Sequence, residues 1–372
     1  MKSLKQKEVL ISGASIAGLS MAYWMNKLGY KVTVVEIANK PRVGGTAIDL
    51  KGETVNVIKR MGILEELKAN ALDLELIEFK NAEDITEGSV FVKKENAEHK
   101  ADEIEIERTI LVAVLLKALK NNVEFIFDNA ISAIDENEDC IHITFKNGLQ
   151  RDYHLLFGCD GTHSGVRKIW FGEEKNYLHF LEAYFSISIV DKLLIKQNTM
   201  QFYNVPGKAV MLNAYKNKTD IVFCFLSEDE IAYDYRNGDQ QRKIIMEQLI
   251  GQGWKTEELI NEIKASENFY FDKFCQIKMP SWTKGRVALV GDAAYCASPA
   301  AGMGGSLAMG GAAAMADALQ KFNGNFELAF LDYNETLRPF IEEVQAEAAL
   351  NIKENFIPKT EEAILRRNML GF

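Results

Sequence analysis

A glycine-rich stretch late in the chain has the residue types and spacing of a site for a negatively charged ligand. Residues 287–290 are an apolar run typical of a buried parallel strand, and Gly291 and Asp292 end that run. A loop of small residues follows, and a helical pattern begins near Ser306. The glycines of the loop that we single out are Gly302, Gly304 and Gly305. Free backbone N–H groups at a helix start attract negative charge, and Asp292 can accept hydrogen bonds from sugar-like hydroxyl groups.

A second glycine-rich stretch lies at the start of the chain. Residues 8–12 form an apolar strand that runs into Gly13-Ala14-Ser15-Ile16-Ala17-Gly18, and a helical pattern and a second strand, residues 31–35, follow. This order is the dinucleotide fingerprint in a βαβ unit, where Gly13 makes the tight turn and Gly18 allows close helix–strand packing. Ser15 replaces the usual middle glycine, and its hydroxyl could hydrogen-bond a phosphate. Glu36 ends the second strand, where an acid binds a ribose and disfavours a 2′-phosphate, so the nucleotide is NAD or FAD rather than NADP.

Composition limits the class of protein and the kinds of partner. The chain has 372 residues, a formal net charge of −10 and 47% hydrophobic residues, which predicts a large core and argues against nucleic acid or anionic membranes as partners. The five cysteines form no C-x-x-C pair, so we expect free thiols in a reducing cytoplasm rather than disulfides or a zinc site. Residues 293–316 are uncharged but mostly Gly, Ala and Ser, and we expect no stable membrane insertion.

The remaining pattern predicts an α/β protein, with a Rossmann-type nucleotide-binding domain, an inserted β-rich substrate lobe and C-terminal helices. Between residues 169 and 272, aromatic and β-branched residues dominate short segments typical of an antiparallel sheet. We therefore divide the chain into residues 1–168 (nucleotide-binding, with an excursion at 72–100 toward the lobe), 169–272 (the β-rich lobe), 273–325 (nucleotide-binding again) and 326–372 (helices that bridge the lobes). An amphipathic helix is predicted over residues 109–120, with Thr109 as its cap.

Together these motifs resemble the single-component FAD-dependent aromatic hydroxylases of the para-hydroxybenzoate hydroxylase type. That group includes the tetracycline-inactivating flavin monooxygenases. The resemblance rests on blocks spread along the chain: Gly13 to Gly18 with Glu36, Gly44-Gly45-Thr46-Ala47-Ile48-Asp49, Arg108, Asp160-Gly161 with Ser164 and Arg167, and Gly291-Asp292-Ala293-Ala294 with Pro299, Gly302 and Gly304. The segment between residues 169 and 272 carries no comparable signature.

The resemblance implies FAD as the cofactor and a role for each block. It assigns the adenosine end to Gly13, Ser15, Ala17, Gly18 and Glu36. It implies that Arg108 contacts FAD, that Asp49 lies near the flavin end, and that Asp292 holds the ribityl or pyrophosphate region. Asp160 ends another buried strand, so it could meet the same ligand as Asp292. Arg42 falls near an arginine implicated in NADPH contact, with a spacing that differs by a residue.

The function that the resemblance implies is hydroxylation. NADPH or NADH reduces FAD, O₂ adds to give a flavin hydroperoxide, and one oxygen passes to an aromatic or polycyclic phenolic substrate, with tetracycline-like molecules among the candidates. We single out no catalytic base, and we expect His163 to make a structural hydrogen bond. His179, Gln201 and Tyr203 could face substrate but fit ordinary strand positions better. A monomer or a weak homodimer is expected.

Two other interpretations stay open. The first is an FAD-dependent reductase or dehydrogenase of related fold, which would give a reduced bond rather than a hydroxylated product. The second is a non-catalytic flavoprotein that binds a drug or pigment and does not turn it over.

Overall fold

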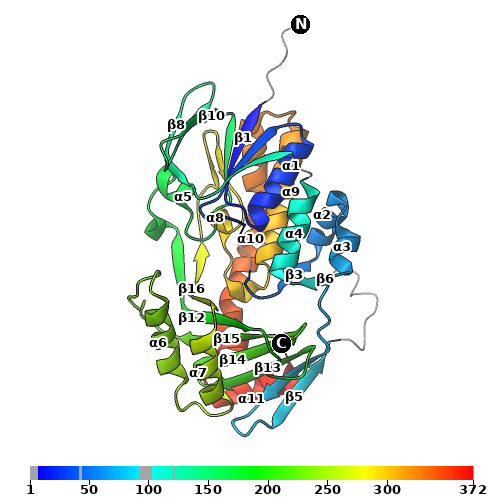
Figure 1. Cartoon of the computed structure of the whole chain (residues 1–372), viewed down its shortest axis with the longest axis vertical. Helices are drawn as coiled ribbons and strands as arrows, with labels where there is room; N and C mark the ends of the chain where they lie inside the picture. The colour runs from blue at the N-terminus through cyan, green and yellow to red at the C-terminus, as the bar shows by residue number, and fades with distance from the viewer. Residues whose placement is uncertain (1–6, 42–43, 93–102, 120–121, 372) are drawn as a thin grey trace.

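The computed structural model describes residues 7–371 except 42–43, 93–102 and 120–121. The chain forms an upper part around a mostly parallel sheet and a lower part around a larger sheet, with the long helix α10 (Phe326–Asn351) running between them (Figure 1). The predicted contact of Arg42 lies outside the described residues.

The upper sheet has the strand order β17-β18-β11-β1-β2-β7. Its strands are β1 (Glu8–Ser12), β2 (Lys31–Val35), β7 (Val123–Ile126), β11 (Leu155–Gly158), β17 (Thr283–Lys284) and β18 (Val287–Leu289). All neighbours pair in parallel except β17, which runs antiparallel at one edge. The central strands β1, β11 and β18 are buried apolar runs, as expected where helices cover both faces of a parallel sheet. The predicted α/β class with a parallel sheet is therefore confirmed.

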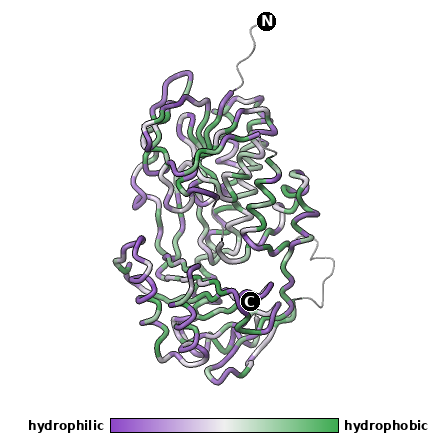
Figure 2. The backbone as a smooth tube through the Cα atoms, in the orientation of Figure 1, coloured by the Kyte–Doolittle hydropathy of each residue, from purple (hydrophilic) through white to green (hydrophobic). Residues whose placement is uncertain are grey.

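Helices from distant parts of the chain share one hydrophobic core with this sheet. They are α1 (Ile16–Lys27), α4 (Arg108–Ala118), α5 (Gly165–Trp170), α8 (Asp292–Tyr295) and α9 (Gly304–Lys321). Helix α9 contacts both α1 and α10, so the two glycine-rich stretches share one core. Figure 2 shows hydrophobic residues concentrated at the centre of this upper part.

The lower sheet has the strand order β16-β12-β15-β14-β13-β4-β5. It combines β4 (Leu76–Lys80) and β5 (Thr86–Phe91) with β12 (Leu178–Val190), β13 (Thr199–Val205), β14 (Lys208–Tyr215), β15 (Lys218–Leu226) and β16 (Asn268–Ile277). Residues from β12 to β16 pack with helices α6 (Gly238–Leu249) and α7 (Thr256–Ala265) in one cluster. A separate apolar cluster joins other sheet residues to Ala300 and to the end of α10. Strand β16 passes residue 272, where we ended the predicted lobe, without a break.

Smaller elements connect the two parts. Strands β3 (Ile48–Lys51) and β6 (Glu103–Ile106) pair, and helices α2 (Glu53–Met61) and α3 (Leu64–Lys68) follow β3. A three-stranded sheet of β8 (Ile131–Glu136), β9 (Ile141–Phe145) and β10 (Gln150–Tyr153) lies beside the parallel sheet, and α11 (Glu361–Leu370) contacts β5 and β13.

The predicted cap of the helix after β6 is wrong. Helix α4 begins at Arg108 with Glu107 at its N-cap position, and Thr109 already lies inside the helix. The Thr109 hydroxyl instead accepts a hydrogen bond from the Gly44 N–H at 3.1 Å. This contact ties the start of α4 to the glycine pair Gly44-Gly45.

Candidate FAD site

The fingerprint turn after β1 needs glycine at two positions because backbone packs directly against it. Gly13 has φ +101°, and a Cβ there would lie 2.5 Å from the Cys159 carbonyl oxygen at the end of β11. A Cβ on Gly18 would lie 1.9 Å from the Gly13 carbonyl oxygen. The Gly13 N–H also donates to the Val35 carbonyl at 2.8 Å, which places this turn against the ends of β2 and β11.

Glu36 lies beside the same turn. One carboxylate oxygen accepts a hydrogen bond from the Ala14 N–H at 2.8 Å, and the other accepts one from the Ala38 N–H at 2.9 Å. A carboxylate has about four acceptor positions, so these bonds leave capacity for ribose hydroxyl groups. The acid is therefore held in the place that the fingerprint predicts.

Arg108 is at the centre of the site. Its Nη2 donates to the Ser15 hydroxyl at 2.7 Å. A Cβ on Gly45 would lie 3.3 Å from the Arg108 Cδ, so the glycine pair passes close to this side chain. Burial raises the pKa of Asp292, and the positive charge of Arg108 acts against that shift. One arginine therefore connects three of the predicted blocks.

The late glycine–aspartate turn meets the early fingerprint helix. Gly291 has φ +67°, and a Cβ there would lie 3.1 Å from the Ala17 Cβ in α1. Asp292 follows at the start of α8. The two glycine-rich stretches, which are almost 280 residues apart along the chain, thus pack against each other.

The loop before α9 meets strand β3. A Cβ on Gly302 would lie 3.8 Å from the Asp49 Oδ2, and one on Gly305 would lie 2.4 Å from the Ile48 Cγ2. The Ser306 hydroxyl donates to the Asp49 carbonyl at 3.2 Å and accepts from the Lys51 N–H at 3.0 Å. Burial raises the pKa of Asp49, and Lys51, whose Nζ is 3.4 Å away, opposes that shift.

The contacts described so far form a row that runs from Glu36 through Arg108 and Asp292 to Asp49 and Gly302. Two helix N-termini adjoin this row of contacts. Helix α1 begins after Ser15 and helix α9 begins at Gly304. Within the described residues, neither helix has a side-chain cap on its first N–H groups or an acidic residue in its first turn. Such ends favour negatively charged groups. The geometry therefore fits a ligand with one anionic group near Ser15 and another near Gly304, as the pyrophosphate and the reduced ring of FAD would supply.

Asp160 is engaged in holding α5. Its carboxylate accepts hydrogen bonds from the Ser164 hydroxyl at 2.5 Å and the Val166 N–H at 3.1 Å. Burial raises the pKa of Asp160, and the Ser164 bond acts against it. The fully buried Arg167 donates to the Ala293 carbonyl at 2.9 Å and pairs with Glu174 at 3.0 Å. This group therefore fixes α5 against the turn that carries Asp292.

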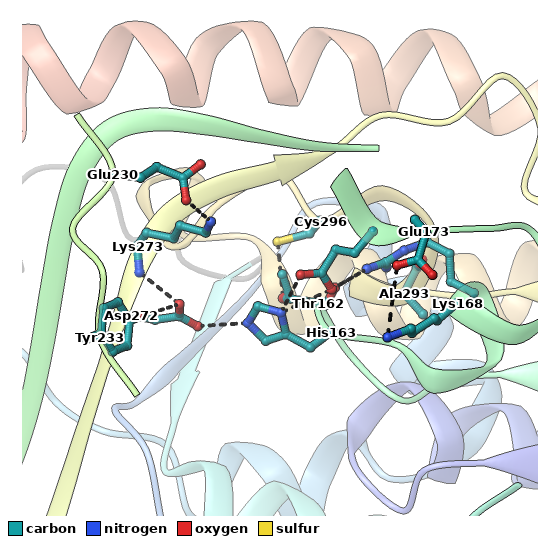
Figure 3. Close-up of polar contacts among 12 residues, drawn as sticks. Thr162, His163, Lys168, Glu173, Glu230, Tyr233, Asp272, Lys273, Ala293 and Cys296 are labelled. Atoms are coloured by element: carbon teal, nitrogen blue, oxygen red, sulfur yellow. Dashed lines mark hydrogen bonds and ion pairs between the residues drawn. The ribbon is translucent and has the colours of Figure 1, made fainter. Parts of the chain in front are cut away.

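His163 has the structural role that we expected. Its Nδ1 lies 3.1 Å from Glu174, and its Nε2 lies 3.5 Å from the Asp272 carboxylate on β16 (Figure 3). The bonds to Asp272 and Glu174 raise the pKa of His163 to about 9. This ion-pair network joins the loop after β11 to the lower sheet.

Two acids near the site, the half-buried Glu105 and the buried Asp220, were not singled out by the sequence. Glu105 on β6 lies opposite Asp49 on β3, and burial, together with the Asp49 charge, raises the pKa of Glu105 to about 7. Asp220 on β15 accepts a hydrogen bond from the Tyr215 hydroxyl at 2.9 Å, and burial raises its pKa to about 7. The alternation of the β6 sequence signals that Glu105 faces away from Ile104 and Ile106, but not that it faces Asp49.

The sheet face next to the flavin-side loops is apolar. Half-buried residues of this face pack in the cluster that contains Phe185, Cys224 and Ala300: Leu181, Ile187, Val222, Leu226 and Tyr270. Ala300 belongs to the turn just before Gly302, so this face adjoins the flavin end of the row. Gln201 and Tyr203 do not belong to it: Gln201 bonds to Glu78 at 2.8 Å, and Tyr203 packs in the cluster with α6 and α7.

A surface groove lies elsewhere on the described residues. It measures about 740 Å³ and is lined by residues of the β8–β9 turn, of β17 and of α10. It contains none of the predicted cofactor residues. In the part of the chain that the structure describes, no helix is both long and apolar enough to cross a bilayer.

Comparison with known proteins shows the family. Residues 6–348 match the model of the FAD binding domain family, and the chain belongs to this family. A flavin-dependent monooxygenase from an unidentified prokaryote is 33% identical over 344 residues, which cover 91% of this chain and 88% of the relative. The crystal structure of the tetracycline destructase Tet(55) matches with a TM-score of 0.86 and 34% identity, covering 98% of this chain and 94% of that one.

A more distant structure shares the fold. Klebsiella pneumoniae HpxO complexed with FAD and uric acid has a TM-score of 0.76 at 18% identity, covering 94% of this chain and 90% of that one. The expectation of an FAD-dependent monooxygenase of this group, related to the tetracycline-inactivating enzymes, is confirmed.

Proposed function

We propose that the chain binds FAD along the row of contacts from Glu36 to Gly302, takes electrons from NADPH or NADH, and uses O₂ to hydroxylate an aromatic or polycyclic phenolic compound. The observation that carries this proposal is the link that Arg108 makes between the two glycine-rich stretches. Its hydrogen bond to Ser15 and its charge beside Asp292 join the start of α1 to the start of α8.

The described residues divide into two halves for the cofactor. Gly13, Ser15, Ala17, Gly18 and Glu36 would hold the adenosine and pyrophosphate half. Asp49, Gly302, Gly304 and Gly305 would surround the ring, with Arg108, Asp160 and Asp292 between the halves. The glycines fit because larger side chains at positions 13, 18 and 305 would collide with neighbouring atoms of the site.

When it is bound, FAD supplies the electron transfer and the activation of oxygen. The protein residues position the ring and exclude water. The N-terminus of α9 would stabilise negative charge on the ring through the N–H groups of the loop that starts at Gly302. The apolar face around Phe185 and Val222 would keep water from the reacting atoms.

The same apolar face supports an aromatic substrate. Ile187, Val222 and Tyr270 are half-buried apolar residues of the cluster that contains Ala300. The 34% identity to a tetracycline destructase makes a tetracycline one candidate. We also propose a cytoplasmic protein, which the five free cysteines support, and a monomer or weak homodimer.

The test uses the purified protein and its bound chromophore. We expect a yellow protein whose flavin spectrum is bleached by NADPH or NADH without oxygen. A screen of phenols and tetracyclines under air should then reveal a product that gains one oxygen atom by mass spectrometry. Protein that neither contains nor takes up FAD would contradict the cofactor assignment. A reduced rather than oxygenated product would contradict the hydroxylation.

A further inference from the structure

A thiol, an imidazole and a carboxylate gather on the small three-stranded sheet, apart from the flavin residues. Ile141 and Ile143 of β9 are buried in the core, so strand alternation turns His142 outward, and Cys140, two residues earlier, lies on the same side. Asp152 on β10 pairs directly with His142 in the antiparallel register. Cross-strand neighbours of this kind have side chains close enough to interact.

The distances bring the three groups into one cluster. The His142 Nδ1 lies 2.6 Å from the Asp152 Oδ1, and the Cys140 Sγ lies 3.8 Å from the His142 Nε2. One ligand atom from each of the three residues lies within 4.8 Å of the others. Zinc bonds of about 2.3 Å to sulfur and about 2.0 Å to nitrogen at a tetrahedral angle place such atoms about 3.5 Å apart. The Sγ–Nε2 separation is close to this value. The Sγ also lies 4.0 Å from the Nδ1, over the ring, so the Cys140 side chain must rotate to share an ion with the Nε2.

The surroundings orient the imidazole. The Asn137 Oδ1 accepts the N–H groups of Asp139 at 2.8 Å and Cys140 at 2.9 Å, which fixes the turn before β9. The Asn137 amide nitrogen therefore faces the His142 Nε2 at 2.8 Å, and the Nδ1–H donates to Asp152. A carboxylate that holds the second ring nitrogen is the usual support of a metal-bound histidine.

We propose that Cys140 and His142, oriented by Asp152, bind a divalent transition-metal ion such as Zn²⁺ at the surface of the three-stranded sheet. The ion lies between the Cys140 Sγ and the His142 Nε2 once the Cys140 side chain has rotated and the Asn137 amide has swung aside. Water completes the coordination, because His142 and Asp152 are both exposed to solvent. Thiolate and imidazole ligands select zinc-like ions over Mg²⁺ and Ca²⁺.

The test is a Zn²⁺ titration of the FAD-loaded, chelator-treated protein by calorimetry. We expect one ion per chain, no binding of Mg²⁺, and slower alkylation of Cys140 by iodoacetamide when Zn²⁺ is present. Mass spectrometry can assign the alkylation, because the four other cysteines are buried. The flavin spectrum shows that each variant is folded.

Four variants test whether Zn²⁺ binds at Cys140 and His142 or only through the general negative charge of the surface. Cys140→Ser should abolish binding, and Asp152→Asn should weaken it about tenfold, as loss of an orienting carboxylate does. Asn137→Asp keeps the turn acceptor and offers a carboxylate oxygen to the metal, so it should tighten binding. Asp135→Asn is the matched control, because Asp135 pairs with His142 from the other side but is outside the cluster. Absence of Zn²⁺ binding, unchanged binding in Cys140→Ser, or an equal loss in Asp135→Asn would overturn the proposal.

Discussion

The Arg108 guanidinium donates to the Ser15 hydroxyl at 2.7 Å, although the two residues are 93 positions apart in the chain. Ser15 stands where the dinucleotide fingerprint usually has its middle glycine. The Ser15 hydroxyl, which a glycine would lack, therefore holds Arg108 at the start of α1. This pair links the fingerprint turn to α4 and, through the Arg108 charge, to Asp292.

We expect Arg108→Ala to weaken FAD binding by about tenfold or more, because hydrogen bonds to charged groups contribute roughly 1.5–3 kcal/mol. Ser15→Ala should have a smaller effect, since it removes only the anchor of the arginine. Fluorescence titration of FAD into stripped protein measures both. Arg151→Ala is the matched control, because Arg151 pairs with Glu124 at 2.8 Å away from the predicted site. Unchanged FAD affinity in Arg108→Ala would remove this residue from the cofactor site.

We expect Gly18→Ala to lose FAD and much of its stability, because the new Cβ would lie 1.9 Å from the Gly13 carbonyl oxygen. The backbone must shift to relieve that contact, and the fingerprint turn moves with it. Gly310→Ala is the matched control in α9, where the described structure has nothing within 4 Å of the new Cβ. That change should stabilise the helix by up to about 1 kcal/mol. Thermal melts and the flavin content of the purified variants distinguish the two outcomes.

Glu105 should make the protein less stable as the pH rises. Burial and the nearby Asp49 raise its pKa to about 7 in the folded state. Between the ordinary glutamate pKa and about 7, the unfolded chain releases a proton that the folded chain keeps. The free energy of unfolding therefore falls as the pH rises, and the fall is complete above about 7. Glu105→Gln should therefore stabilise the protein at pH 8, by an amount on the order of 3 kcal/mol at most, and have little effect at pH 4. Equal urea midpoints for the two proteins at pH 8 would contradict this expectation.

His163 should have the opposite pH dependence. Asp272 and Glu174 raise its pKa to about 9, so the stabilisation from the charged imidazole is complete below the ordinary histidine pKa and is lost as the pH rises through about 9. His163→Gln should therefore lower the melting temperature at pH 6 and make a smaller difference at pH 9.5. The loss should be modest, because about half of the His163 side chain is exposed and solvent screens the pairs. A constant difference across this range would mean that packing rather than charge is lost.

Much of the fold was accessible from local patterns. The fingerprint, the buried strand before Gly291 and the helical stretch after Gly302 each have a short sequence signal, because backbone geometry at a turn restricts the residue type. The start of α4 was placed one residue late, since Thr109 looks like a cap while its hydroxyl actually receives the Gly44 N–H. Sequence alone cannot distinguish a cap from a hydroxyl that serves another segment.

Contacts between distant segments were not accessible in this way. Strand β4 joins β13 in parallel across more than a hundred residues, and no local pattern specifies that partner. The pairing of Glu105 with Asp49 and of His142 with Asp152 depends on strand register. A slip of one residue would turn these side chains to the opposite face of the sheet. For the same reason, cysteine spacing gave no indication of the cluster around Cys140.

The sequence by itself determined the nucleotide-binding unit, because glycines at close backbone contacts and an acid at a strand end are local requirements of nucleotide binding. The resemblance of its motifs to a known family indicated the flavin. Only the tertiary structure decided which side chains meet: Arg108 with Ser15 and Asp292, His163 with Asp272, and Cys140 with His142 and Asp152. Electrostatic and ligand contacts act over a few ångströms in space, and chain separation does not encode those distances.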